Sequence, residues 1–158
     1  MLRVRRTTAW ALFAAGLLSI ALTGVLMRFP TGYIKAQSSS AGSLAGRTDL
    51  AELRDAAIRD LAIYVPMYTA IGIGMTWLIV ANRRRRAMLT GLLVIGAVVD
   101  LAETALFHNT TERLLDGAMA SALATQTTWT LILSAIKYVA LLAALALLAV
   151  TIAGDEPS

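Results

Sequence analysis

The sequence contains no cysteine among its 158 residues, and this absence excludes several kinds of site. Disulfides, thiol catalysis, thioether-attached haem and iron–sulfur clusters all require cysteine. His108 is the only histidine, so a zinc site of the usual kind is not expected either. We therefore predict no metal site, and the sequence points to no particular cofactor.

Charged residues are also scarce. They make up 15% of the chain, whereas hydrophobic residues make up 58%; a soluble domain is about 25% charged and about 45–50% apolar. Both deviations indicate a protein that lies in a lipid bilayer. The net charge is +4, but the basic residues cluster beside apolar runs, which is typical of contacts with anionic lipid headgroups. No basic face suited to nucleic acid is left, so nucleic acid is not an expected partner.

Four long apolar runs are present, at about residues 8–27, 61–81, 87–107 and 128–153. Each has about 20 residues or more, which as a helix crosses a hydrocarbon core of about 30 Å. The runs lack the alternating pattern of a membrane β-barrel, so helices are the structure that satisfies their backbone in lipid. We predict an all-α bundle of four transmembrane helices that forms a single integral membrane domain over residues 1–158.

The first run admits a second interpretation. Its basic start and apolar continuation also resemble a secretory leader that is cleaved. The run is long for the apolar part of a leader, and Ile34, Lys35 and Ala36 form a poor cleavage site. We therefore interpret residues 8–27 as a spanning helix.

Two longer connections are expected to carry short surface helices. The outer loop, residues 28–60, includes an amphipathic segment at about 48–60 that Thr48 or Asp49 can cap. This segment either lies on the membrane surface or extends the second span outward. The pattern of apolar residues within 109–127 predicts a second short surface helix.

Basic residues predict the orientation of the bundle. Four consecutive arginines stand between the second and third spans, and three more precede the first span. Because Lys and Arg accumulate on the cytoplasmic side, both groups place the N-terminus, and with four spans also the C-terminus, in the cytoplasm. The expected location is the bacterial plasma (inner) membrane, which the chain crosses in several passes. The arginines concerned are Arg3, Arg5, Arg6, Arg83, Arg84, Arg85 and Arg86.

Ionisable residues within the spans are the main candidates for function, because such residues are costly in lipid and face the bundle interior. Asp100, Glu103 and Lys137 lie well inside their spans, and Asp60 lies at the outer end of the second. At a rise of about 1.5 Å per residue, Asp100 lies about 10 Å and Lys137 about 12–14 Å below the outer ends of their helices. We therefore expect these two side chains at similar depth.

Helical periodicity places the polar residues on facing sides of the spans. Asp100 and Glu103 share one side of the third span, and Tyr64 and Tyr68 share one side of the second. We expect these sides to meet in a polar cluster in the outer half of the bundle. The candidates for a ligand or proton site are Asp60, Tyr64, Tyr68, Asp100, Glu103 and Lys137, with Arg28 and His108 as peripheral candidates at the outer boundary.

Two interpretations of this cluster are open. In the first, Asp100 and Lys137 form a structural ion pair that fixes the register of the helices and need not add stability. In the second, three acids outnumber the single cation within the spans, and the surplus charge requires protonation, a bound cation or water. The second interpretation makes the cluster a site for proton handling, for a cationic ligand or for a hydrated pocket.

The same residues carry a resemblance to a group of known proteins. They are Asp60 with Tyr64 and Tyr68 on the second span, the Asp100-x-x-Glu103 pair on the third, and Lys137 on the fourth. In this layout the chain resembles small bacterial four-span membrane proteins of uncharacterised function, over about residues 58–150. The resemblance implies a shared four-span fold and a shared polar cluster, and it brings no known activity.

Motifs of the common hydrolases, metalloproteases and nucleotide-binding proteins are absent. We expect a non-enzymatic accessory, assembly or ligand-binding component, surrounded by lipid and belonging to a homo-oligomer or a larger membrane complex. One alternative is a component of a proton- or cation-coupled transporter or channel that uses Asp100, Glu103 and Lys137. A second alternative is an intramembrane enzyme for a lipid or isoprenoid, with Asp100 or Glu103 as acid or base. That enzyme needs an outward-opening apolar pocket that ends at the carboxylates.

Overall fold

The computed structural model describes residues 6–154, and the described part of the chain is helical without any strand. Arg3 and Arg5 lie outside the described residues. The elements are α1 (Arg6–Leu26), α2 (Tyr33–Gln37), α3 (Ala41–Ala45), α4 (Leu50–Arg59), the π-helix η1 (Asp60–Tyr64), α5 (Val65–Ile79), α6 (Arg83–Leu115), the 3₁₀-helix η2 (Ala120–Leu123) and α7 (Ala124–Gly154).

Four helical segments in the described chain are long and apolar enough to cross a membrane. Their bounds are Thr7–Leu26, Leu50–Ile79, Arg83–Leu115 and Ala120–Gly154. Each has at least the roughly 20 residues that a hydrocarbon core requires. The prediction of an all-α fold with four potential spans is confirmed.

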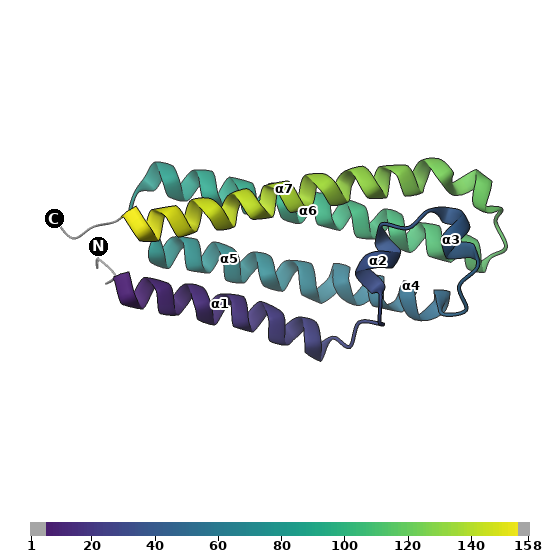
Figure 1. Cartoon of the computed structure of the whole chain (residues 1–158), viewed down its shortest axis with the longest axis horizontal. Helices are drawn as coiled ribbons and strands as arrows, with labels where there is room; N and C mark the ends of the chain where they lie inside the picture. Colours follow the sequence, from purple (N-terminus) through teal and green to yellow (C-terminus); the bar gives the residue numbers. More distant parts are fainter. Residues whose placement is uncertain (1–5, 155–158) are drawn as a thin grey trace.

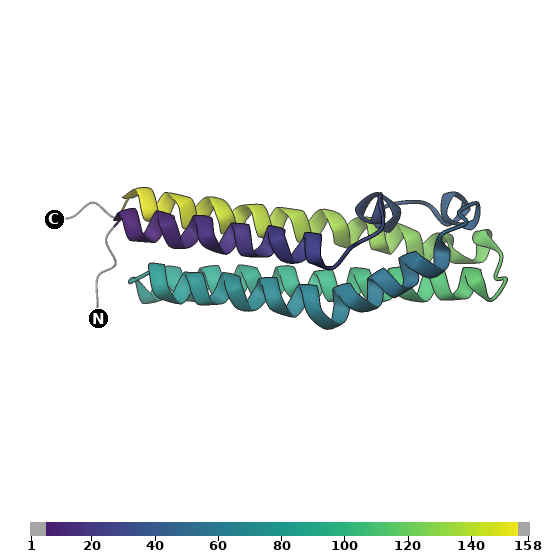
Figure 2. The same cartoon turned by 90° about the horizontal axis from the view of Figure 1, so that it is seen from below.

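The four long segments lie side by side as an elongated bundle (Figure 1). α1 begins and α7 ends at the same end of the bundle, and the turn between α5 and α6 lies there too (Figures 1 and 2). We call this the arginine end, because the turn carries Arg83–Arg86. The opposite end, which holds α2, α3 and η2, is called the loop end.

The turn at the arginine end is fixed by side chains that bond to the backbone. The Asn82 side-chain oxygen accepts hydrogen bonds from the N–H groups of Arg84 (3.0 Å) and Arg85 (3.1 Å), and so caps α6. Arg86 Nε donates to the carbonyl of Val80 (2.9 Å), just beyond the last turn of α5. Its guanidinium also lies 5.1 Å from the centre of the Trp77 ring. These bonds satisfy backbone groups that the helix ends leave free.

Both predicted surface segments are extensions of the long helices. α4 runs through η1 into α5 as one continuous segment, and residues 109–115 continue α6. Asp49 stands at the start of α4, but its side chain does not cap the helix. Packing explains the continuity, because the apolar side of α4 buries Leu53 in one cluster with Phe107 of α6.

One widened turn joins α4 to α5. In η1 the N–H of Val65 bonds to the carbonyl of Asp60, five residues earlier. Pro66 follows directly and has no N–H to continue the ordinary four-residue bonding pattern. Single π-turns of this kind occur frequently at functional sites.

α1 is the least buried of the four long helices. Ala9 is its only residue in the buried hydrophobic core of the described chain, whereas α7 contributes Ala140, Ala144, Leu148 and Ile152. α1 lies close to α5 at Gly16, where an added Cβ would lie 1.9 Å from the sulfur of Met75. α1 therefore packs on α5 at the edge of the bundle (Figure 1).

Candidate functional site

An ion triad joins the two most closely packed helices. Lys137 Nζ of α7 lies 2.9 Å from Asp100 Oδ1 and 2.6 Å from Glu103 Oε2, both on α6. All three side chains are buried, and Glu103 is inaccessible to solvent. The contact confirms that Asp100 and Lys137 lie at the same depth and on facing sides, as the helical rise and periodicity predict.

Two hydroxyl groups complete the triad. Tyr68 of α5 donates to Asp100 Oδ2 (2.6 Å), and Ser134 of α7 donates to Glu103 Oε1. All four oxygens of the two carboxylates therefore have a partner, as buried charges require. We call these five residues the closed cluster: Tyr68, Asp100, Glu103, Ser134 and Lys137.

Asp60 is a second buried acid with a different environment. It lies in η1, and its Oδ2 accepts hydrogen bonds from Tyr33 (3.2 Å), Gln37 (3.4 Å) and Thr104 (3.4 Å). These donors are neutral, and Asp60 forms no ion pair among the described residues. Burial and the nearby Asp60 carboxylate raise the pKa of the Tyr33 phenol well above its ordinary value, so Tyr33 acts as a hydrogen-bond donor at neutral pH.

Aromatic rings connect the two acids. Phe29 stacks on Tyr33 with ring centres 5.0 Å apart, and it meets Tyr64 edge to face with ring centres 5.6 Å apart. Tyr64 in turn meets Tyr68 at 5.6 Å in an edge-to-face contact. The edge-to-face contact of Tyr33 with Phe107 anchors α2 on α6. Such geometries are the favoured ones for aromatic pairs and add rigidity to the loop end.

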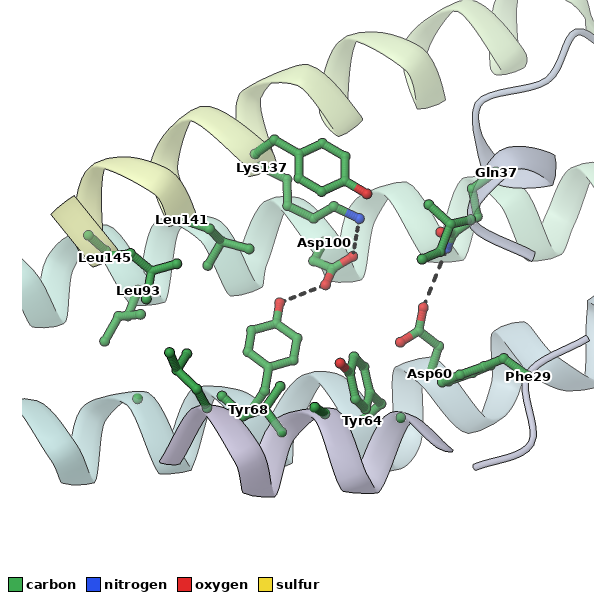
Figure 3. A pocket seen from close by; sticks show the side chains of 18 of the residues that line it. Phe29, Gln37, Asp60, Tyr64, Tyr68, Leu93, Asp100, Lys137, Leu141 and Leu145 are labelled. Atoms are coloured by element: carbon green, nitrogen blue, oxygen red, sulfur yellow. Dashed lines mark hydrogen bonds and ion pairs between the residues drawn. The ribbon is translucent and has the colours of Figure 1, made fainter. Parts of the chain in front are cut away.

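A cavity of about 640 Å³ adjoins these residues (Figure 3). Its polar end, near the loop end of the bundle, is formed by Gln37, Asp60, Asp100 and Lys137. From there the cavity continues toward the arginine end between apolar walls. Residues of the apolar walls include Leu17, Ile20, Ala21 and Val25 of α1, Gly72 and Met75 of α5, Leu89 and Leu93 of α6, and Leu141, Ala144, Leu145 and Leu148 of α7.

The cavity opens on the side of the bundle between α1 and α7. Val25 of α1 is 75% exposed, and Tyr138 and Leu145 of α7 are 46% and 37% exposed. Lining residues of α5 and α6, such as Met75 and Leu89, are buried. The opening therefore lies between α1 and α7, is lined by apolar side chains and faces the outside of the bundle.

The structure brings most of the sequence-predicted site residues together. Those that line the cavity are Asp60, Tyr64, Tyr68, Asp100 and Lys137, whereas Glu103 lies behind them in the closed cluster.

The two peripheral candidates lie elsewhere. Arg28 sits in a shallow depression beside Glu52 and Asp55. His108 is 3.9 Å from Glu112, one turn further along α6.

Sequence reasoning missed three residues at the polar end: Phe29, Tyr33 and Gln37. All three belong to the outer loop after α1, for which the sequence predicts no helix before about residue 48. The signal available was the spacing of Tyr33 and Gln37, which places both on one side of a helical turn.

No group of His, Asp or Glu in the described chain is arranged to hold a metal ion. No protein-family model, no curated protein and no solved structure matches this chain.

Proposed function

We propose that this chain is a ligand-binding membrane protein that holds a single-chain amphiphile within its bundle. The head group lies at the polar end of the cavity, beside Asp60 and the closed cluster. The apolar tail lies along the cavity toward Ala144 and Leu148. The observation that carries the proposal is the cavity itself, which is apolar along its length and polar at one end.

The dimensions of the cavity suit such a ligand. Its volume of about 640 Å³ lies within the range of roughly 300–1,000 Å³ that is typical of small-molecule sites. From Lys137 to Leu148 the cavity follows α7 over about 16 Å, at the helical rise of 1.5 Å per residue. An elongated shape with one polar end matches a head group followed by a flexible chain.

Access from the lipid is the natural route to this site. The opening between α1 and α7 is lined by apolar side chains, and both helices are long and apolar enough to span a membrane. An amphiphile that moves sideways from the bilayer keeps its tail in an apolar environment throughout. α1 contacts the bundle least, so its displacement widens the opening at the smallest cost in buried contacts.

The hydrogen bonds within the closed cluster favour a binding function over proton transfer or catalysis. Both oxygens of Asp100 and both oxygens of Glu103 already have partners. A general acid or base must reach the proton that it transfers, within hydrogen-bonding distance or through one water. The apolar pocket that the enzyme alternative needs is present, yet its proposed acids are engaged with Lys137.

Filling the cavity is expected to abolish binding. Ala21 of α1 lines the cavity near its opening, so Ala21→Trp places an indole where the tail lies. Because Ala21 is exposed, the larger side chain needs no repacking of the core. We expect labelling by a diazirine-bearing dodecanol in phospholipid nanodiscs to fall by at least roughly 10-fold at the cavity residues, as identified by peptide mass spectrometry.

Ala14→Trp is the matched control. Ala14 is also an exposed alanine of α1, but it does not line the cavity, so labelling should be unchanged. Labelling spread evenly over the lipid-facing helices, without competition by unlabelled dodecanol, would contradict the proposal. Equal labelling of wild type and Ala21→Trp would do so as well.

The proposed setting is the bacterial plasma membrane, with both chain ends in the cytoplasm and the loop end outside. The arginine end carries Arg83–Arg86, and cytoplasmic ends of spans are enriched in such residues. The polar end of the cavity then lies in the outer half of the bilayer. The exposed apolar faces of α1 and α7 are available to lipid, to a second copy or to another membrane protein.

The lack of cysteine makes this orientation testable with single introduced thiols. Gly46→Cys lies at the loop end, where an added Cβ meets nothing within 4 Å, and Ala81→Cys lies at the arginine end. Both positions are exposed. In intact cells, a membrane-impermeant maleimide should label Cys at 46 and should label Cys at 81 only after permeabilisation. The reverse pattern would show that the arginine end faces outward.

A further inference from the structure

The polar end of the cavity holds more negative than positive groups. Asp60, Asp100 and Glu103 face one cation, Lys137, among the described residues around this site. Lys137 is bound to both acids of the closed cluster, so its charge is shared there. Asp60 has only neutral donors, and a buried carboxylate without a cation is an unfavourable arrangement. A ligand that brings positive charge would correct it.

Asp60 also has an oxygen that remains open to a ligand. The side chain is 6% exposed and lines the cavity, and its hydrogen bonds from described residues all end on Oδ2. Oδ1 therefore has its full capacity to accept hydrogen bonds. Figure 3 shows the carboxylate beside Phe29 and Tyr64, at the end of the cavity nearest α2.

The aromatic rings at this end favour a cation too. Phe29 and Tyr64 both line the cavity and contact each other edge to face. The face of an aromatic ring carries partial negative charge and attracts ammonium groups within about 6 Å. A carboxylate next to such rings is a common arrangement for binding organic cations, and the apolar walls beyond it suit an organic tail.

We propose that the head group of the bound amphiphile is a protonated amine that pairs with Asp60 Oδ1 beside the rings of Phe29 and Tyr64. This inference rests on the proposed function and names the ligand class of the same site. An ammonium head group donates a charge-assisted hydrogen bond, whereas an alcohol donates only a neutral one. An anionic head group meets the carboxylates of Asp60 and Asp100, while the charge of Lys137 is already engaged with the acids of the closed cluster, so it is rejected.

A set of three probes with the same tail tests the head group. The protein in phospholipid nanodiscs is incubated with tritiated dodecylamine, and unlabelled dodecylamine, dodecanol and laurate are added as competitors. We expect dodecylamine to compete roughly 10- to 100-fold better than dodecanol, the range that a hydrogen bond to a charged group provides. Laurate should be the weakest competitor.

Asp60→Asn should remove the preference for the amine. The amide has the same shape and still accepts from Tyr33 and Gln37, but it lacks the charge. Dodecylamine should then compete no better than dodecanol, and the affinity for dodecanol should be retained. The control is Asp55→Asn, which removes an exposed acid that pairs with Arg54 and should change neither affinity.

A second variant covers the case in which Asp60→Asn fails to fold. Phe29→Leu keeps an apolar side chain but removes the ring, and it should lower the affinity for dodecylamine several-fold relative to dodecanol. If the amine preference survives both substitutions, the assignment to Asp60 and its rings is overturned.

The outcomes separate this inference from the proposed function. Equal binding of dodecylamine and dodecanol that is lost in Ala21→Trp would overturn the amine head group and leave the amphiphile site standing. Tightest binding of laurate would overturn the inference and assign the head group to Lys137. Absence of saturable binding by all three probes would overturn both.

Discussion

Replacing Lys137 by Met should lower the free energy of unfolding by about 3–5 kcal/mol, the usual cost of removing one partner from a buried charge network. The substitution keeps an unbranched side chain, one atom shorter, but leaves Asp100 and Glu103 without a cation at the centre of the bundle. Their remaining partners, Tyr68 and Ser134, are neutral hydroxyls. The measurement is unfolding in mixed detergent micelles with increasing dodecyl sulfate, followed by circular dichroism.

A rescue experiment distinguishes lost charge balance from lost packing. The triple variant Lys137→Met, Asp100→Asn, Glu103→Gln contains no charge in the closed cluster and should recover most of the stability. Lys35→Met changes an exposed lysine of α2 and should have little effect. A stable single variant, or a triple variant no better than the single one, would show that the ion triad does not govern the stability of the bundle.

The ion triad has the contacts of the first interpretation that the sequence left open, a structural ion pair between α6 and α7. Asp100, Glu103 and Lys137 form a closed network that fixes α6 against α7. The same network forms one wall at the polar end of the cavity, where Asp60 keeps an open oxygen. A rigid structural cluster thus positions the polar end at which we propose that a ligand binds.

The four potential spans and the pairing of Asp100 with Lys137 could be predicted because both depend on regular helix geometry. Span length sets the number of apolar residues, and a rise of about 1.5 Å per residue converts sequence position into depth. The spacing of Asp100 and Glu103, three residues apart, places them on one side of α6. No knowledge of the loops is needed for these conclusions.

The polar end around Asp60 could not be predicted in the same way. Tyr33 and Gln37 reach Asp60 because α2 folds back onto α6, where Tyr33 also contacts Phe107. The sequence does not encode such a tertiary contact in any periodic pattern. The π-turn at Asp60 is equally irregular, since it inserts a wider turn into an otherwise continuous helix. The cavity depends on how loosely α1 packs, which composition alone does not reveal.

Phe107→Ala is expected to be the second strongly destabilising change, with a loss of about 3–5 kcal/mol in the free energy of unfolding. Phe107 is 1% exposed and packs in the core of the loop end with Leu53 and Tyr33. Removing the ring leaves a void between α4 and α6, and it also removes the edge-to-face contact that holds α2 in place. Unfolding in mixed micelles measures the first effect.

Hydrogen exchange measures the second effect, because the backbone of Tyr33–Gln37 should exchange faster once α2 is released. Loss of α2 also withdraws two of the donors to Asp60, so binding of dodecylamine should change even though Phe107 does not line the cavity. Val98→Ala is the control: Val98 is 58% exposed on the same helix, and its truncation should stay within about 0.5 kcal/mol. If Phe107→Ala lowers stability without faster exchange in α2, then the short helix is held by its polar bonds to Asp60 and not by the aromatic contact.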